Sequence, residues 1–84
     1  MARYQVLYWQ DIPSQVKAWD DFDEVNVEMP PRFGARIDRV AQNAGLTDSD
    51  AYLEHWKWGE ESEREGSPSV VAQAVRDELE AGFK

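Results

Sequence analysis

The sequence predicts an α+β fold: a two-layer sandwich of a mainly antiparallel four-stranded sheet with two helices on one face, in the order β-β-β-α-β-α. Up to Met29 the sequence favours strands, through β-branched and aromatic residues in 3–10 and clean alternation of apolar and polar residues in 24–29. Two later segments repeat apolar residues every three or four positions, which is the periodicity of helices. The chain has 84 residues and therefore predicts a single domain, 1–84.

The first three strands follow one another with short connections. Residues 3–10 are rich in β-branched and aromatic side chains and carry bulk on both faces, which favours a central or doubly covered strand. Pro13 interrupts the pattern before a weaker strand over residues 14–19. After the acidic turn Asp20–Glu24, residues 24–29 alternate cleanly, with one face for the core and one for water. These strands predict an antiparallel meander.

A helix follows the third strand. Pro30 and Pro31 suit its entry, and Gly45 is placed to end it in the left-handed conformation with Leu46 folding back. Its predicted apolar stripe consists of Phe33, Ile37, Val40, Ala41 and Ala44. The next segment, beginning at Thr47, is a polar loop or one short helical turn that starts at Thr47 or Ser49.

Residues 52–58 alternate again and predict the fourth strand, with Trp56 and Trp58 on one face and His55 on the other. If this strand joins the same sheet, a right-handed crossover through the first helix brings it parallel to the third strand. The acidic run Glu60–Gly66 either extends the fourth strand or forms a solvated loop.

A second helix closes the chain. Ser67 can cap it and Pro68 suits its first position. Its stripe is Val71, Ala74, Val75, Leu79 and Phe83.

Composition excludes several classes of function. A formal net charge of −8 disfavours phosphate backbones, so we expect no nucleic-acid partner. No segment has the length and apolar character of a membrane helix or of a signal peptide, so we expect a cytoplasmic protein that does not bind membranes. Without cysteine the chain offers neither a disulfide nor a thiolate zinc site, and its core must come from packing.

The tryptophans are the main candidates for a binding surface. Trp56 and Trp58 are spaced to share one face of a strand, where they either pack under the helices or line an exposed groove. Trp9 and Trp19 can extend such a patch on the sheet face away from the helices.

The polar candidates are fewer. His55 is the only histidine and has the chemistry of a general base, but no nucleophile is near it in sequence. Arg36 belongs to the only basic cluster, with Arg32 and Arg39, and arginines at this spacing either bind an anion or pair with acids. The acidic turns lack the pattern of a calcium loop. We therefore assign no catalytic, cofactor-binding or metal-binding residue and expect no cofactor.

Several segments together resemble a small bacterial family, the virulence factor domain, which also forms the C-terminal part of the conserved virulence factor C proteins. The resemblance covers nearly the whole chain and is carried by YQVLYWQDIPSQV, MPPRF, GLTDSDAYLEHWKWGEESEREGS and VAQAVRDELE. It implies no assigned activity and no site residues. In longer relatives the domain accompanies HEAT-like repeats and a segment similar to iron–sulfur scaffold proteins, which implies an accessory or adaptor role.

Three functional hypotheses remain at the level of sequence. The first is a non-enzymatic module that binds a protein, or a second copy of itself, through a sheet face or edge. The second is a small enzyme or ligand binder with a pocket lined by Trp9, Trp56 or Trp58, in which His55, Arg36 or a glutamate supplies polarity. The third, which rests on the family context, is an accessory factor in iron–sulfur or metal handling.

Overall fold

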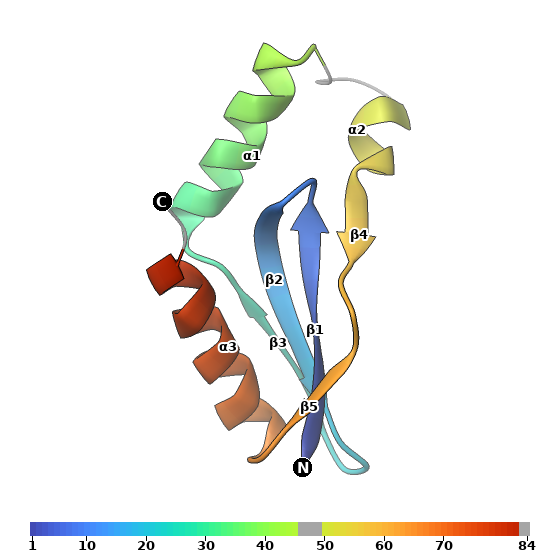
Figure 1. The fold of residues 1–84 in the computed structure, drawn as a ribbon, viewed down its shortest axis with the longest axis vertical. Coiled ribbons are helices and arrows are strands. Elements are labelled where there is room, and N and C mark those ends of the chain that lie inside the picture. The colour runs from blue at the N-terminus through green and yellow to red at the C-terminus, as the bar shows by residue number, and fades with distance from the viewer. Residues whose placement is uncertain (46–49, 83–84) are drawn as a thin grey trace.

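The computed structural model describes residues 1–45 and 50–82. It contains one sheet and three helices over that part of the chain, drawn in Figure 1. The strands are β1 (Ala2–Trp9), β2 (Ile12–Trp19), β3 (Glu24–Glu28), β4 (Trp56–Trp58) and β5 (Ser62–Arg64), and the helices are α1 (Pro31–Asn43), α2 (Asp50–Glu54) and α3 (Pro68–Gly82). The α+β class and the leading β-β-β-α order are confirmed.

The sheet has the order β3-β2-β1-β4, and β5 pairs with the same edge of β1 as β4. All its pairs are antiparallel, including those of β4 and β5 with β1. The first three strands form the expected meander. The conditional expectation that the fourth strand runs parallel to the third was wrong. Strands β3 and β1 are both antiparallel to β2, and β4 pairs antiparallel with β1, so β4 runs opposite to β3.

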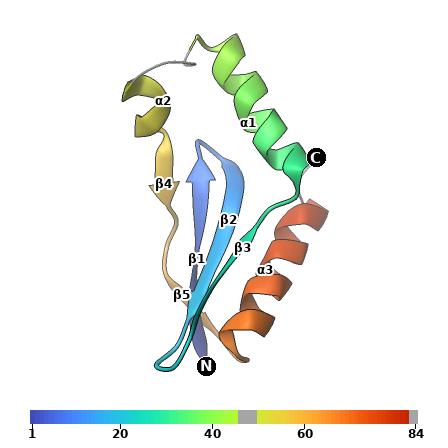
Figure 2. The ribbon, with the colours of Figure 1, turned by 180° about the vertical axis from the view of Figure 1, so that it is seen from behind.

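Helices α1 and α3 follow one another along one side of the molecule, and α2 and β4 lie on the other side (Figures 1 and 2). Both long helices contribute to a single core, as predicted for two helices on one face. The sheet supplies Val6, Val16 and Ala18 to this core, and the helices supply Phe33, Ile37, Ala41, Val71, Ala72 and Val75. Of the described helices, none is long and apolar enough to cross a membrane.

The predicted helix boundaries hold closely. Ala44 follows the last residue of α1, and Gly45 has φ +73°, the left-handed conformation expected at the stop signal. Ala44 itself is exposed, unlike the rest of its predicted stripe. At the start of α3, the Val70 amide donates to Ser67 Oγ over 3.4 Å, which is the predicted cap. Leu46, Thr47, Ser49 and Phe83 lie outside the described residues.

Strand β2 begins earlier than predicted and includes Pro13. Leu7 faces Gln15, whereas Tyr8 faces Pro13, so the register shifts by one residue and Ser14 forms a bulge. A proline is tolerated at such an irregularity because no regular ladder hydrogen bond is required from its nitrogen.

The largest local difference concerns residues 52–58. Residues Asp50–Glu54 are helical, and only Trp56–Trp58 forms a strand. The helical turn brings Tyr52 next to Trp56, four residues on, with ring centroids 6.2 Å apart. A short apolar run is compatible with either a helix or a strand, so the sequence pattern alone did not distinguish the two. The acidic run Glu60–Gly66 was expected either to extend the fourth strand or to form a solvated loop. Part of it forms β5 and pairs with β1, so the run does continue in the sheet.

An ion pair joins β5 to α3 and gives a pH prediction. The Arg64 guanidinium donates to both carboxylate oxygens of Glu78. This hydrogen bond lowers the pKa of Glu78 from the ordinary 4.5 of glutamate. The unfolded chain therefore binds the proton more readily than the folded one, so the pair stabilises the fold fully above pH 4.5 and less as the pH falls through the folded pKa.

We expect Glu78→Gln to lose less stability than the wild type on acidification below pH 4.5. The difference should be small, because both side chains are exposed to solvent. Urea unfolding followed by circular dichroism at neutral and acidic pH measures it. Glu65→Gln, a neighbouring exposed acid, is the charge-matched control. If the free energy of unfolding falls equally with acidification in the wild type and in Glu78→Gln, the prediction is contradicted.

Candidate functional site

One face of the sheet is not covered by α1 or α3. Cross-strand partners share a face, so the register assigns residues to it directly. We call this surface the open sheet face. It is made by Arg3, Gln5 and Leu7 of β1, Gln15, Lys17 and Trp19 of β2, Glu24, Asn26 and Glu28 of β3, Trp58 of β4 and Glu63 of β5.

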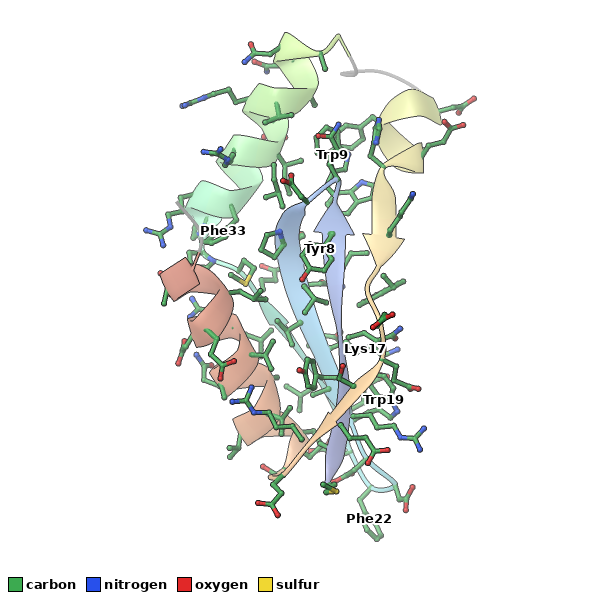
Figure 3. The ribbon with its side chains drawn as sticks, viewed as in Figure 1. Tyr8, Trp9, Lys17, Trp19, Phe22 and Phe33 are labelled. Atoms are coloured by element: carbon green, nitrogen blue, oxygen red, sulfur yellow. The ribbon has the colours of Figure 1, made fainter. Side chains whose placement is uncertain are left out.

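Lys17 lies between two tryptophans on the open sheet face. Its Nζ is 5.5 Å from the ring centroid of Trp19 and 5.9 Å from that of Trp58. Both distances are within the range of a cation–π contact. Lys17 Nζ also lies 3.2 Å from Glu24 Oε1, across the β2–β3 pair. Figure 3 shows Lys17 and Trp19 on the side of the sheet away from α3.

Trp58 remains 45% exposed in this arrangement, and Trp19 is half-buried. Leu7, which is directly opposite Trp58 in the sheet, is also only partly covered. Partly exposed apolar side chains from β1, β2 and β4 thus lie on the same face as Lys17. We call Trp19, Lys17 and Trp58 the Trp–Lys–Trp cluster.

The other two tryptophans serve the fold at the opposite end of the sheet. Trp9 is fully buried; its indole N–H donates to the Tyr52 carbonyl over 2.9 Å. The rings of Tyr52 and His55 contact it at centroid distances of 5.4 and 5.3 Å. Trp56 pairs with Trp9 in the sheet and packs against the core. Trp9 anchors α2 to β1, so it cannot line an open pocket.

The structure therefore separates the candidate residues into groups. Trp19 and Trp58 meet on the open sheet face, whereas Trp9, Trp56 and His55 meet around α2. His55 is not on a strand as expected; it follows α2 and is half-buried, and its carbonyl accepts a hydrogen bond from the Gln10 amide. Arg36 is on the exposed side of α1 and does not belong to the Trp–Lys–Trp cluster.

Lys17, which lies on the open sheet face, and Phe22, which lies next to it, were not singled out from the sequence. Lys17 and Trp19 are two residues apart in residues 14–19, so the strand pattern already placed both side chains on one face. Phe22 lies at the tip of the turn between β2 and β3, as Figure 3 shows, and is 96% exposed. No periodic signal marks a single aromatic residue within an acidic turn.

Ion pairs also cross this side of the sheet. Arg3 lies 3.8 Å from Glu61 and 3.6 Å from Glu63, so its charge is balanced, as that of Lys17 is by Glu24. The surrounding surface therefore has a surplus of carboxylates. Among residues 1–45 and 50–82, no group of three or more His, Cys, Asp or Glu side chains is placed to hold a metal ion.

We compared the chain with protein-family models, curated proteins and solved structures, and only the family models gave a match. No significant match was found to a curated protein or to a solved structure. The family model described as virulence factor matches residues 7–84, which is nearly the whole chain and includes both the Trp–Lys–Trp cluster and the residues around Trp9. This match confirms the resemblance seen in the sequence, and the chain belongs to the virulence factor family.

Proposed function

We propose that this member of the virulence factor family is a non-enzymatic, cytoplasmic protein-interaction module that binds its partner through the open sheet face. The single observation that carries the proposal is the Trp–Lys–Trp cluster, in which Trp58, 45% exposed, and the half-buried Trp19 both contact Lys17 on the face that α1 and α3 do not cover. Covering a tryptophan that is held partly in water on such a surface lowers the free energy of the complex.

The shape of the surface supports a macromolecular partner. Small molecules are usually bound in concave pockets that enclose most of their surface. The open sheet face instead spreads its aromatic and charged side chains over β1, β2 and β4. Tryptophan is among the residues that contribute most to protein–protein binding, particularly where polar groups surround it. Lys17, Glu24 and Arg3 provide that polar surrounding here.

The edges of the sheet are less suited to this role. The edge strand β3 has five residues, and two glutamates mark its ends. Short length and charge are common protections against strand addition. Arg76 Nε also donates to the Glu28 carbonyl over 3.0 Å, which occupies the backbone where β3 ends. The other edge is made by β4 and β5, which have only three residues each. The face rather than either edge is therefore the favoured surface.

We expect Trp58→Ser to weaken partner binding by about tenfold or more, which is the usual effect of removing a central tryptophan. Val70→Ser is the matched control, because Val70 is an exposed apolar residue of α3, outside the open sheet face, and is 60% exposed. Proteins captured by the wild-type chain are identified, purified and titrated against both variants by calorimetry.

The proposal requires that Val70→Ser binds like the wild type while Trp58→Ser does not. Equal affinity of Trp58→Ser and wild type for every purified partner would contradict it. The proposal would also be contradicted if the protein sediments as a monomer at every concentration and captures no protein specifically. Unchanged circular dichroism of both variants shows that any loss of binding is not a loss of fold.

A further inference from the structure

The turn between β2 and β3 is held by aspartates. Asp20 Oδ1 accepts hydrogen bonds from the amides of Phe22 and Asp23, each over 2.8 Å. The Asp20 amide donates to the Asp23 carbonyl over 2.9 Å, and Asp23 Oδ1 accepts from the Glu24 amide over 2.9 Å. Aspartate side chains commonly fix turns in this way. The turn is therefore well ordered by local hydrogen bonds.

None of these hydrogen bonds uses the side chain of Phe22. An exposed phenylalanine forgoes the stabilisation that burial of its ring provides. Phe22 is 96% exposed, although any small polar residue satisfies the same turn geometry. The ordered turn thus presents an aromatic ring to solvent at one end of the open sheet face.

Phe22 borders an open hollow of about 480 Å³, which we call the hairpin hollow. Its lining includes Arg3, Trp19, Asp20, Asp21, Phe22 and Glu63. The hollow thus combines two aromatic rings with three carboxylates, the Arg3 guanidinium and the amino group of Met1, which also lines it. Glu63 is paired with Arg3, and the three carboxylates still outnumber the two cations, so the hollow carries a net negative charge.

We propose that the hairpin hollow receives an arginine side chain from a basic segment of the partner protein, while Phe22 packs against the apolar part of that segment. The inference rests on the proposed function and names the chemistry of the partner. A guanidinium suits such a site because it stacks on aromatic rings and donates two parallel hydrogen bonds to a carboxylate.

The neighbouring Trp–Lys–Trp cluster supports this chemistry. There the protein already holds a cation against two tryptophans and pairs it with a glutamate. The hairpin hollow offers the same kinds of group, an aromatic surface with carboxylates at its rim, and its Arg3 is already paired with Glu61 and Glu63. Trp19 belongs to both places, so a basic segment that follows the open sheet face contacts both.

The test uses a synthetic peptide of alternating arginine and serine as the probe, titrated into the ¹⁵N-labelled chain. We expect chemical-shift changes at the amides of Asp20–Glu24 and at the indole of Trp19. The buried indole of Trp9 reports on unspecific effects and should not shift. A peptide with citrulline in place of arginine has nearly the same shape without the charge and should bind at least about tenfold more weakly.

Two variants separate the ring from the charge. Phe22→Ser should weaken the arginine peptide about tenfold, and Val70→Ser should not, although both remove an exposed apolar side chain. Asp21→Asn should weaken it about threefold without disturbing the turn hydrogen bonds, and Asp38→Asn on α1 should leave it unchanged.

Shifts spread over all acidic surfaces, or equal affinity of the arginine and citrulline peptides, would overturn the inference. Self-association that is lost in Phe22→Ser would overturn it in favour of a second copy as the occupant. If the arginine peptide does not bind but capture of a purified partner still depends on Trp58, the proposed function stands and this inference alone fails.

Discussion

Trp9→Ala should destabilise the protein by about 3–5 kcal/mol, the usual cost of removing a large buried ring. Trp9 is fully buried, and its loss leaves a cavity between β1 and α2. It also leaves the Tyr52 carbonyl without the indole donor. Since 84 residues give a total stability of only about 4–13 kcal/mol, this loss removes a large share of it, and the variant should unfold at a much lower urea concentration than the wild type.

Trp58→Ala is the matched control. It removes the same side chain from a position that is 45% exposed, where the known contact is with Lys17. We expect a loss of no more than about 1 kcal/mol. Urea unfolding followed by circular dichroism compares the two variants, and Trp9→Phe, which keeps much of the bulk but not the N–H donor, should lie between them. Equal costs at Trp9 and Trp58 would show that the tryptophans are not divided between core and surface.

This division could not be predicted from the spacing of the tryptophans. Trp56 and Trp58 are two residues apart and were expected to share one environment. Trp56 packs against the core because Tyr52 comes back onto it from α2, whereas Trp58 lies beyond the reach of that turn. The difference depends on where a helix ends and a strand begins, and local periodicity determines such boundaries least well.

The parts of the fold that were predicted correctly have long, regular patterns. The alternation of Val25 and Val27, the stripe of Phe33, Ile37 and Ala41, and the stop at Gly45 each reflect local geometry. The pairing of β4 and β5 with β1 is a contact between distant parts of the chain. Leu7 faces Trp58, and no feature of either strand alone selects that partner.

The candidate site follows the same rule. Alternation within β2 places Lys17 and Trp19 on one face, so two of the three residues of the Trp–Lys–Trp cluster are already determined by one strand. Trp58 joins them only through the long-range pairing of β4. The exposure of Phe22 is a tertiary property too, because a ring in a turn can fold back onto the sheet or remain in solvent.

Phe33→Ala should also cost about 3–5 kcal/mol. Phe33 is 1% exposed, and it is the largest of the three residues that α1 buries. Its amide donates to the Pro30 carbonyl over 2.9 Å, so the ring is fixed at the start of the helix, where the chain leaves β3. Without the ring, α1 retains Ile37 and Ala41 as its buried contacts, and a helix of 13 residues is marginal without tertiary packing.

We therefore expect hydrogen exchange in Phe33→Ala to accelerate more in α1 than in α3, which has its own buried residues Val71, Ala72 and Val75. Phe22→Ala is the matched control, since the same ring at 96% exposure should cost no more than about 0.5 kcal/mol. A similar cost at Phe22 and Phe33 would contradict the assignment of the two rings. If the expected contrast is observed, Phe22 contributes little to folding, and its ring is available for the contact with a basic segment proposed above.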